Sequence, residues 1–120
     1  MIKIFDLFAG IGGFRYASKK IFNKYKIKSE TIGWSEIDKY CQKTYIANYN
    51  TSKNYFVDDI KKITGNNNNF CDIKNYNSLQ KTQFIKKTLP KFDFLMAGFP
   101  CQSFSSMGKQ KGFDDERGAL

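Results

Sequence analysis

An apolar run that leads directly into a glycine-rich turn constrains the fold of this chain more than any other feature. The run covers Ile2–Leu7, and the turn reads Phe8-Ala9-Gly10-Ile11-Gly12-Gly13. From Phe14 to Lys24 the apolar residues recur at roughly helical spacing. This order predicts a strand, a tight turn and a helix, which is the opening unit of a parallel α/β sheet.

The alternation of strand and helix continues along the chain. Thr31–Ser35 is typical of a second strand, and Asp38 is placed to cap a helix that runs to about Asn48. Tyr55–Val57 and Phe92–Ala97 are expected to form the third and fourth strands. The pattern predicts a parallel sheet with right-handed crossovers.

Three further expectations concern packing and connections. The helix that ends near Asn48 is expected to make its contacts through four residues: Tyr40, Thr44, Tyr45 and Ala47. The four-asparagine run at 66–69 favours neither helix nor strand and indicates a surface loop. The Ser-, Gly- and Lys-rich stretch after Cys101 predicts a long exposed loop.

Charge and residue counts narrow the classes of function. Lysine and arginine number 20 against 11 acidic residues, and the resulting charge of +9 would suit a polyanionic partner. Nearly all of these cations are lysines, whereas base readout favours arginine forks, so the charge is equally compatible with a solvated surface. The absence of histidine excludes hydrolases that use a Cys-His dyad.

Cysteine usage and hydropathy bear on the compartment. The three cysteines, at positions 41, 71 and 101, suit neither a zinc site nor a disulfide framework, so no metal is expected and the thiols should be reduced. No apolar run approaches the ~20 residues that span a bilayer, and no signal-peptide pattern precedes the first strand. We therefore expect a cytoplasmic protein without a membrane partner.

The ends of the first three expected strands carry residues that suit a nucleoside-like ligand. The glycine turn lets the backbone approach a ligand closely, and Glu36 stands where it could accept hydrogen bonds from ribose hydroxyls. Asp59 follows the third strand. The turn departs from the dinucleotide pattern G-x-G-x-x-G because Arg15 takes the place of the third glycine. A structural turn with two solvated acids is the alternative.

A second candidate site follows the fourth strand, in the segment Gly98-Phe99-Pro100-Cys101-Gln102-Ser103-Phe104-Ser105. A cysteine just beyond a buried strand is exposed and positioned, whereas a structural cysteine more often lies within the strand. An inert thiol is nevertheless the more common case for an isolated cysteine. Without histidine, a Cys101 thiolate would need an electrophile that is activated by other means.

Five ordered motifs over nearly the whole chain resemble those of the DNA cytosine-5 methyltransferases. Asp6–Arg15 is similar to the family's first signature, and Ala97–Ser105 is similar to its catalytic signature. The remaining three motifs are matched by Ser35–Asp38, by Asp59–Ile60 and, for the opening of the last, by Arg117–Leu120. The family's mobile loop is resembled by Gly108–Phe113. The resemblance implies an α/β fold, namely the first four strands and flanking helices of a partial Rossmann-like methyltransferase sheet.

The resemblance implies S-adenosylmethionine as the cofactor. The residues implied to bind it lie in the glycine turn, after the second and third strands, and next to the nucleophile: Phe8, Ala9, Gly10, Ile11, Gly12, Gly13, Glu36, Ile37, Asp59, Ile60 and Pro100. Glu36 would bind the ribose hydroxyls and Asp59 the adenine amino group. Three apolar side chains would pack on the adenine: Phe8, Ile37 and Ile60. Asp58 departs from the glycine that the family often has there, which bears on the geometry of the strand end.

The implied reaction is methylation of carbon 5 of cytosine in double-stranded DNA, expected in a bacterial restriction-modification system. Cys101 would be the nucleophile, because its addition at carbon 6 makes an enamine that can attack a sulfonium methyl group. The cytosine would have to be flipped out of the duplex. Gln102, Ser103 and Ser105 would approach the flipped nucleotide and its phosphates.

Residues 1–120 are therefore expected to be the N-terminal part of the catalytic domain, ending after the catalytic loop. The family's Glu-Asn-Val motif, which protonates cytosine N3, its target-recognition domain and its later strands are not in the sequence. We expect activity only with a C-terminal segment or second chain that carries them. Three alternatives are the tRNA-methylating branch of the family, an inactive fragment that binds DNA or a partner, and, less favoured, a nicotinamide-dependent Rossmann enzyme.

Overall fold

A computed structural model describes residues 1–62, 79, 83, 86 and 88–99 of the chain. Its elements, in chain order, are β1 (Ile2–Leu7), α1 (Gly13–Lys24), β2 (Ser29–Ser35), α2 (Lys39–Asn48), β3 (Tyr55–Val57), the 3-10 turn η1 (Ile60–Lys62) and β4 (Phe94–Ala97). The four strands form one parallel sheet in the order β3-β2-β1-β4. The predicted α/β fold is confirmed.

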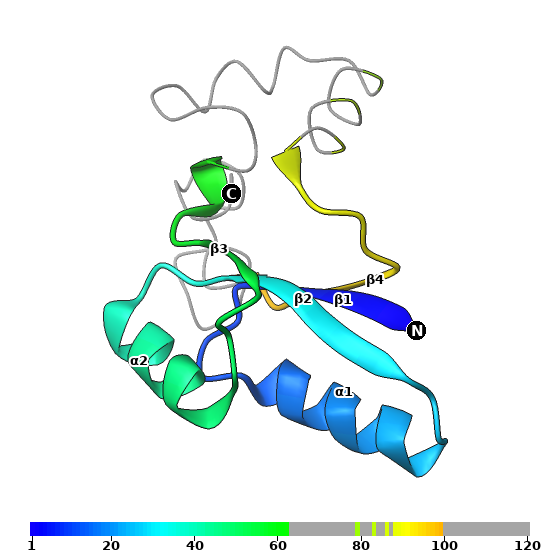
Figure 1. Ribbon diagram of the computed structural model, residues 1–120. Coiled ribbons are helices and arrows are strands. Elements are labelled where there is room, and N and C mark those ends of the chain that lie inside the picture. The colour runs from blue at the N-terminus through cyan, green and yellow to red at the C-terminus, as the bar shows by residue number, and fades with distance from the viewer. Residues whose placement is uncertain (63–78, 80–82, 84–85, 87, 100–120) are drawn as a thin grey trace, which may run out of the picture.

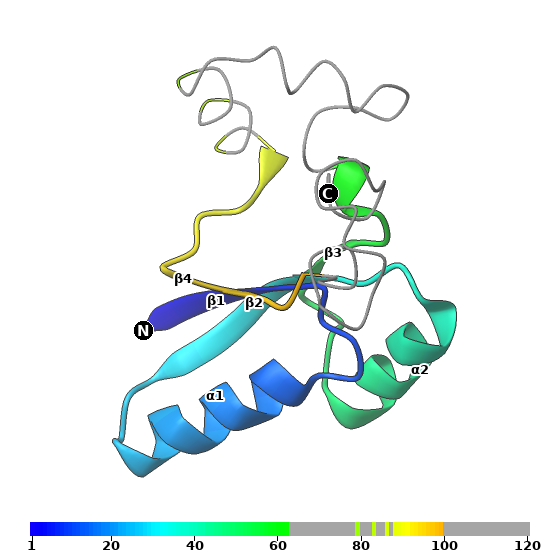
Figure 2. The ribbon, with the colours of Figure 1, turned by 180° about the vertical axis from the view of Figure 1, so that it is seen from behind.

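The helices α1 and α2 lie on one side of the sheet, as the two opposite views agree (Figures 1 and 2). The chain moves outward from β1 to β2 to β3, and right-handed crossovers in one direction place their helices on one face. The order then reverses, because β4 follows β3 along the chain but pairs with the opposite edge of β1. Open α/β sheets bind ligands at such a reversal, beyond the carboxyl ends of the strands.

Three element boundaries differ slightly from expectation. β2 begins two residues early, at Ser29, and α1 begins at Gly13 rather than at Phe14. β4 begins at Phe94, and Asp93 before it bonds to β1 through both its main chain and its side chain: its amide donates to the Lys3 carbonyl at 2.8 Å, and its Oδ2 accepts from the Lys3 amide at 2.8 Å. A carboxylate thus replaces the main-chain acceptor that a ladder would use at this position.

An aromatic stack packs against the side of the sheet that faces the helices, near the ends of β1 and β2. The ring of Trp34 lies 4.3 Å from that of Tyr45 at an interplanar angle of 13°, and Phe56 covers it at 4.3 Å. Ala9 completes this buried cluster, against which Tyr49 packs. The last residues of β1 and β2 are therefore held rigidly from the helix side.

The contacts predicted for α2 were largely wrong. Asp38 does cap the helix, since its Oδ1 accepts from the Cys41 amide at 2.8 Å. Of the four residues expected to make its contacts, however, only Tyr45 is buried, and Tyr40, Thr44 and Ala47 are exposed. The helix touches the sheet along one narrow line on which Tyr45 and Tyr49 are neighbours, because residues four apart share a helix face.

α1 covers the sheet loosely, and none of its residues is buried. Its apolar side chains and those of β4 line a groove formed by Phe14, Ala17, Ser18, Ile21, Phe22, Phe94, Leu95, Met96 and Ala97. In dinucleotide-binding folds a third glycine lets helix and strand approach closely. Arg15 stands in that place here, and its long side chain is consistent with the looser packing.

Within the described part of the chain, no helix has the length and apolar character needed to cross a membrane. The asparagine run at 66–69 and the stretch after Cys101 lie outside the described residues.

Candidate functional site

The glycine turn between β1 and α1 has the tight geometry that its sequence predicts. Phe8, Gly10 and Gly12 adopt positive φ angles of 52°, 55° and 95°. The Ala9 amide donates to the Ser35 carbonyl at 2.9 Å, and the Gly12 amide closes the turn on the Ala9 carbonyl at 2.9 Å. Glycine is required at position 12, because an added Cβ would overlap the Tyr49 ring and the φ angle disfavours any other residue.

Glu36 reaches across from the end of β2 and binds this turn directly. The Gly10 amide donates to Glu36 Oε2 at 2.6 Å, and the Asp38 amide donates to Oε1 at 2.9 Å. A carboxylate offers about four acceptor positions, so each oxygen keeps capacity for another donor. The side chain is only half-buried and open to a ligand. The predicted juxtaposition of Glu36 with the turn is confirmed, although its role as a brace was not foreseen.

Two large apolar side chains are exposed to solvent on the two segments that the Gly10–Glu36 hydrogen bond joins. Ile11, in the glycine turn, is 61% exposed, and Ile37, next to Glu36, is 67% exposed. Phe8 and Ile60 are partly buried, and Ala9 is buried. Apolar surface beside hydrogen-bonding groups is a usual feature of sites for small molecules.

Two acidic residues follow β3, and their side chains bind different partners. Asp59 Oδ1 accepts from the Lys61 amide at 2.9 Å and so begins η1. Asp58 Oδ1 accepts from the Asp59 amide at 2.8 Å and pairs with Lys62 Nζ at 2.6 Å, which lowers the pKa of Asp58. Asp58 does not adopt a positive φ angle, so the glycine common in the family is not needed for this geometry.

The pairing of β1 with β4 brings the glycine turn and the first residues of the second candidate segment to one edge of the sheet. Leu7 is in register with Ala97, so the glycine turn and the segment Gly98–Phe99 leave the sheet side by side. A Cβ added to Gly98 would come within 2.9 Å of the Phe14 ring, which packs there from the first turn of α1. The following site residues lie outside the described residues: Pro100, Cys101, Gln102, Ser103 and Ser105.

A polar network beneath the turn was missed by the sequence analysis. Asp6, in β1, is fully buried, and the Tyr45 hydroxyl donates to its Oδ2 at 3.1 Å. That hydroxyl in turn accepts from Arg15 Nη1 at 3.3 Å, so a chain of hydrogen bonds runs from α1 through α2 into the central strand. An acidic residue within an apolar strand was the available signal, because a buried carboxylate needs a partner.

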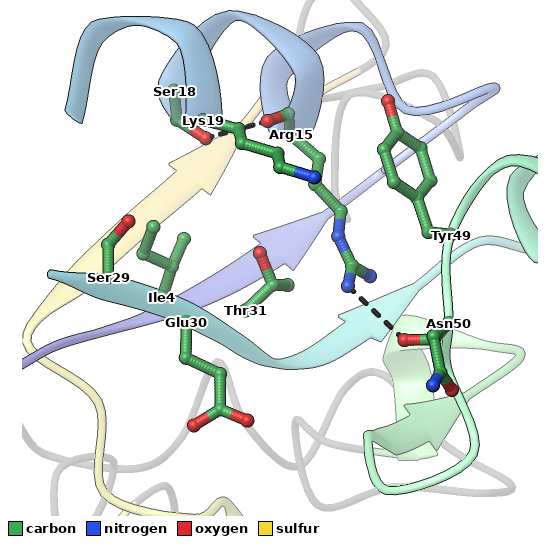
Figure 3. A pocket seen from close by; sticks show the side chains of 9 residues that line it. All are labelled: Ile4, Arg15, Ser18, Lys19, Ser29, Glu30, Thr31, Tyr49 and Asn50. Atoms are coloured by element: carbon green, nitrogen blue, oxygen red, sulfur yellow. Dashed lines mark hydrogen bonds between the residues drawn. The ribbon is translucent and has the colours of Figure 1, made fainter. Parts of the chain in front are cut away.

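Arg15 also fastens the segment between α2 and β3. Its Nη1 donates to Asn54 Oδ1 at 3.1 Å and its Nη2 to the Asn50 carbonyl at 3.4 Å. Asn54 continues the chain by donating from Nδ2 to the Thr31 carbonyl of β2 at 2.7 Å. Figure 3 shows the Arg15 side chain descending from α1 past the ring of Tyr49 toward Asn50. One guanidinium thus ties the β1–β2 connection, which contains α1, to the β2–β3 connection, which contains α2.

The surroundings of Asp6 favour its protonated form. Burial, with a smaller contribution from the Glu36 charge, raises the pKa of Asp6 from 3.8 to about 6, against the opposing influence of the Tyr45 hydroxyl and the Arg15 charge. Among the described residues, Asp6 Oδ1 has no hydrogen-bond partner. Burial raises the pKa of Tyr45 as well, so its hydroxyl keeps the proton that it donates to Asp6.

A parallel sheet whose order reverses beside a glycine turn, with a carboxylate bound to that turn from the next strand, defines an α/β protein of the class that binds nucleotides or nucleosides at its strand ends. Comparison with known proteins gives the family. The model of the C-5 cytosine-specific DNA methylases matches residues 2–120, and the chain belongs to that family.

Curated relatives match over nearly the whole chain. The type II methyltransferase M.HgiCI of Herpetosiphon aurantiacus is 39% identical over 120 residues, which are 100% of this chain and 22% of that protein. M.BanI of Aneurinibacillus aneurinilyticus is 40% identical over 119 residues, 99% of this chain and 22% of that protein. M.HhaI of Haemophilus parahaemolyticus is 40% identical over 119 residues, 99% of this chain and 27% of that protein. The chain thus spans about a quarter of the length of these relatives.

The buried carboxyl group makes a specific prediction for stability. Because the folded-state pKa of Asp6 lies above its ordinary value, the folded chain binds more protons than the unfolded chain between pH 3.8 and about 6. The contribution of Asp6 is therefore fully present below that window and is lost as the pH rises through it, by up to about 3 kcal/mol.

Asp6→Asn should remove this loss, while the amide oxygen still accepts from Tyr45. Urea unfolding of both forms, followed through the fluorescence of Trp34, the only tryptophan, measures the difference at each pH. The difference should change across the window in favour of the variant. A constant difference from pH 4 to pH 7 would contradict the assignment.

Proposed function

We propose that residues 1–120 are the N-terminal, cofactor-binding part of a DNA (cytosine-5-)-methyltransferase catalytic domain. The observation that carries the proposal is the meeting of three strand ends. The Gly10–Glu36 hydrogen bond joins the ends of β1 and β2, and the Leu7–Ala97 pairing brings the segment that leads to Cys101 beside the same turn. Membership of the methylase family supports this reading of the site.

The residues around the turn fit S-adenosylmethionine. Gly12, the N-cap of α1, supplies no side-chain cap, and no acidic residue occupies the first turn, so the helix N-terminus is left open to an anionic group such as the cofactor's carboxylate. Glu36 has acceptor capacity for the ribose hydroxyls. Ile11 and Ile37 offer apolar surface to the adenine, and Asp59 would bind its amino group. When bound, the cofactor supplies an electrophilic methyl group on a sulfonium.

The nucleophile in this proposal is Cys101. Its thiolate bonds to carbon 6 of a cytosine that has been flipped out of double-stranded DNA, and electron density moves to carbon 5, which takes the methyl group as the carbon–sulfonium bond breaks. Loss of the proton from carbon 5 and of the thiolate from carbon 6 then restores the aromatic ring. Gln102, Ser103 and Ser105 would contact the target nucleotide and its phosphates.

The remaining parts of the reaction belong to the rest of the enzyme. The chain spans 22–27% of the relatives named above, whose names describe type II methyltransferases. We therefore place the activity in a bacterial restriction-modification setting, and assign protonation of cytosine N3 and reading of the DNA sequence to a C-terminal segment or second chain. A completed enzyme here means this chain joined to or mixed with those later motifs.

The first prediction concerns the cofactor. Glu36→Ala should weaken S-adenosylmethionine binding by about 1–3 kcal/mol, because it removes a hydrogen-bond acceptor from a partly buried site. Calorimetry measures the affinity. The matched control is Glu30→Ala, which removes the same charge from an exposed position in β2, the strand that Glu36 follows, and should leave the affinity unchanged. Equal affinities for Glu36→Ala and the unsubstituted chain would remove Glu36 from the site.

The second prediction concerns the nucleophile. A duplex that contains 5-fluorocytosine blocks the elimination step, so a completed enzyme should form a denaturation-resistant adduct that Cys101→Ser abolishes. Cys41→Ser is the control: burial and the Asp38 charge raise the pKa of the Cys41 thiol, which makes it a weak nucleophile, and this variant should still form the adduct. An adduct in Cys101→Ser would place the nucleophile elsewhere.

The third prediction is that the chain alone does not methylate DNA. β4 pairs only with β1 among the described strands, and the groove between β4 and α1 exposes apolar side chains, so the chain should also tend to associate. Adding the later motifs should raise stability and activity together. Tritium transfer from labelled S-adenosylmethionine to DNA is the measurement, and transfer by the chain alone would refute the prediction. Transfer to tRNA but not to duplex DNA would favour the tRNA-methylating branch.

A further inference from the structure

Tyr49, which no motif of the sequence singled out, contacts the glycine turn at its most constrained residue. The Tyr49 hydroxyl donates to the Gly12 carbonyl at 2.8 Å. Its ring lies so close to the Gly12 Cα that an added Cβ would overlap it. The contact bridges 37 residues of sequence and joins the C-terminal end of α2 to the N-cap of α1.

The carbonyl that Tyr49 binds is the one that begins α1. Gly12 O also accepts from the Tyr16 amide at 2.9 Å, which is the first hydrogen bond of the helix. The orientation of this carbonyl therefore sets the direction of the helix axis at its N-terminus, and with it the direction of the unpaired amides of the first turn.

Tyr49 is itself held from several sides. As the C-cap of α2 it donates its amide to the Tyr45 carbonyl at 3.0 Å, and the two rings lie 5.0 Å apart. The Arg15 guanidinium lies over the Tyr49 ring, 4.7 Å from its centroid. Figure 3 shows the two side chains next to each other. Burial raises the pKa of Tyr49, so the hydroxyl stays protonated and remains a donor at neutral pH. The ring is thus a fixed support rather than a side chain free to turn.

We propose that Tyr49 is a positioning residue for the cofactor, acting through Gly12. Its hydroxyl fixes the Gly12 carbonyl so that the amides of the first turn of α1 face the cofactor's carboxylate. The inference rests on the proposed function, since it assumes that S-adenosylmethionine binds at this turn. In this scheme Tyr49 acts only through Gly12, so it should affect cofactor affinity and leave the chemical step unchanged.

The test is Tyr49→Phe, which removes one oxygen and keeps the ring. Calorimetry should give a dissociation constant for S-adenosylmethionine about 5–10-fold higher than that of the unsubstituted chain, the effect of one lost hydrogen bond. Tyr40→Phe is the matched control, because it removes a hydroxyl from the same helix at a side chain that is 80% exposed, and it should change nothing. In a completed enzyme the KM for S-adenosylmethionine should rise by the same factor at unchanged kcat.

The outcomes separate the two proposals. If the unsubstituted chain and the completed enzyme both fail to bind S-adenosylmethionine, the proposed function fails and this inference fails with it. If they bind, and Tyr49→Phe binds equally well, only the role of Tyr49 is refuted. The emission of Trp34, which stacks on Tyr45, reports whether the core of the variant is intact. A changed emission with a lower binding stoichiometry, but an unchanged dissociation constant, would assign Tyr49 a purely structural role and overturn the inference.

Discussion

A carboxyl group buried in the central strand governs how the helices of this sheet are attached. An unpaired carboxylate in the interior is costly, and Asp6 is compensated by the Tyr45 hydroxyl and, beyond it, by the Arg15 guanidinium. Because these partners come from α2 and α1, satisfying one group in β1 fixes both helices against it. Arg15 extends the same constraint to the connection that precedes β3, through Asn54. The glycine turn lies directly above this network, so its shape is determined by interactions that do not involve a ligand.

The parts of this fold that could be predicted from the sequence are those that local chemistry determines. Ile2–Leu7 and Tyr55–Val57 were predicted at their observed bounds, because an apolar run bounded by turn residues carries its own signal. The packing of α2 could not be predicted in this way, because the side of a short helix that meets the sheet depends on residues far away in sequence. Tyr45 is buried because it bonds to Asp6 and stacks on Trp34, and its neighbours in sequence do not indicate this. At the start of β4, the Asp93 side chain likewise bonds to a residue far away in sequence.

In the candidate site, too, some features could be predicted from the sequence, and others depend on contacts between distant segments. Strand-end logic placed Glu36 beside the glycine turn, because parallel strands deliver their carboxyl ends to one edge. It could not show that the Glu36 carboxylate braces Gly10 and Asp38, since those bonds depend on the local path of two turns. Asp58 stands where the family often has glycine. Because the backbone there does not adopt a positive φ angle, this difference does not change the backbone geometry of the strand end. Tyr49 lies outside every motif, and Arg15 belongs to the first family-like segment without a role that its position assigns, so only the folded arrangement reveals what they support.

Glu36 links the stability of the turn to the binding of a ligand. The same carboxylate oxygens that accept from the Gly10 and Asp38 amides retain acceptor positions on their open side, so a ribose would add to the existing bonds rather than compete with them. If the proposed function holds, the site would need little rearrangement to receive the nucleoside of the cofactor, which would limit the ordering cost of binding. The reversal of strand order beside β1 then sets the cofactor turn next to the segment that leads to Cys101, because Leu7 and Ala97 are in register. Under the proposed function, this topology would bring the methyl donor toward the nucleophile, whereas the acid that completes the reaction would come from a separate part of the protein.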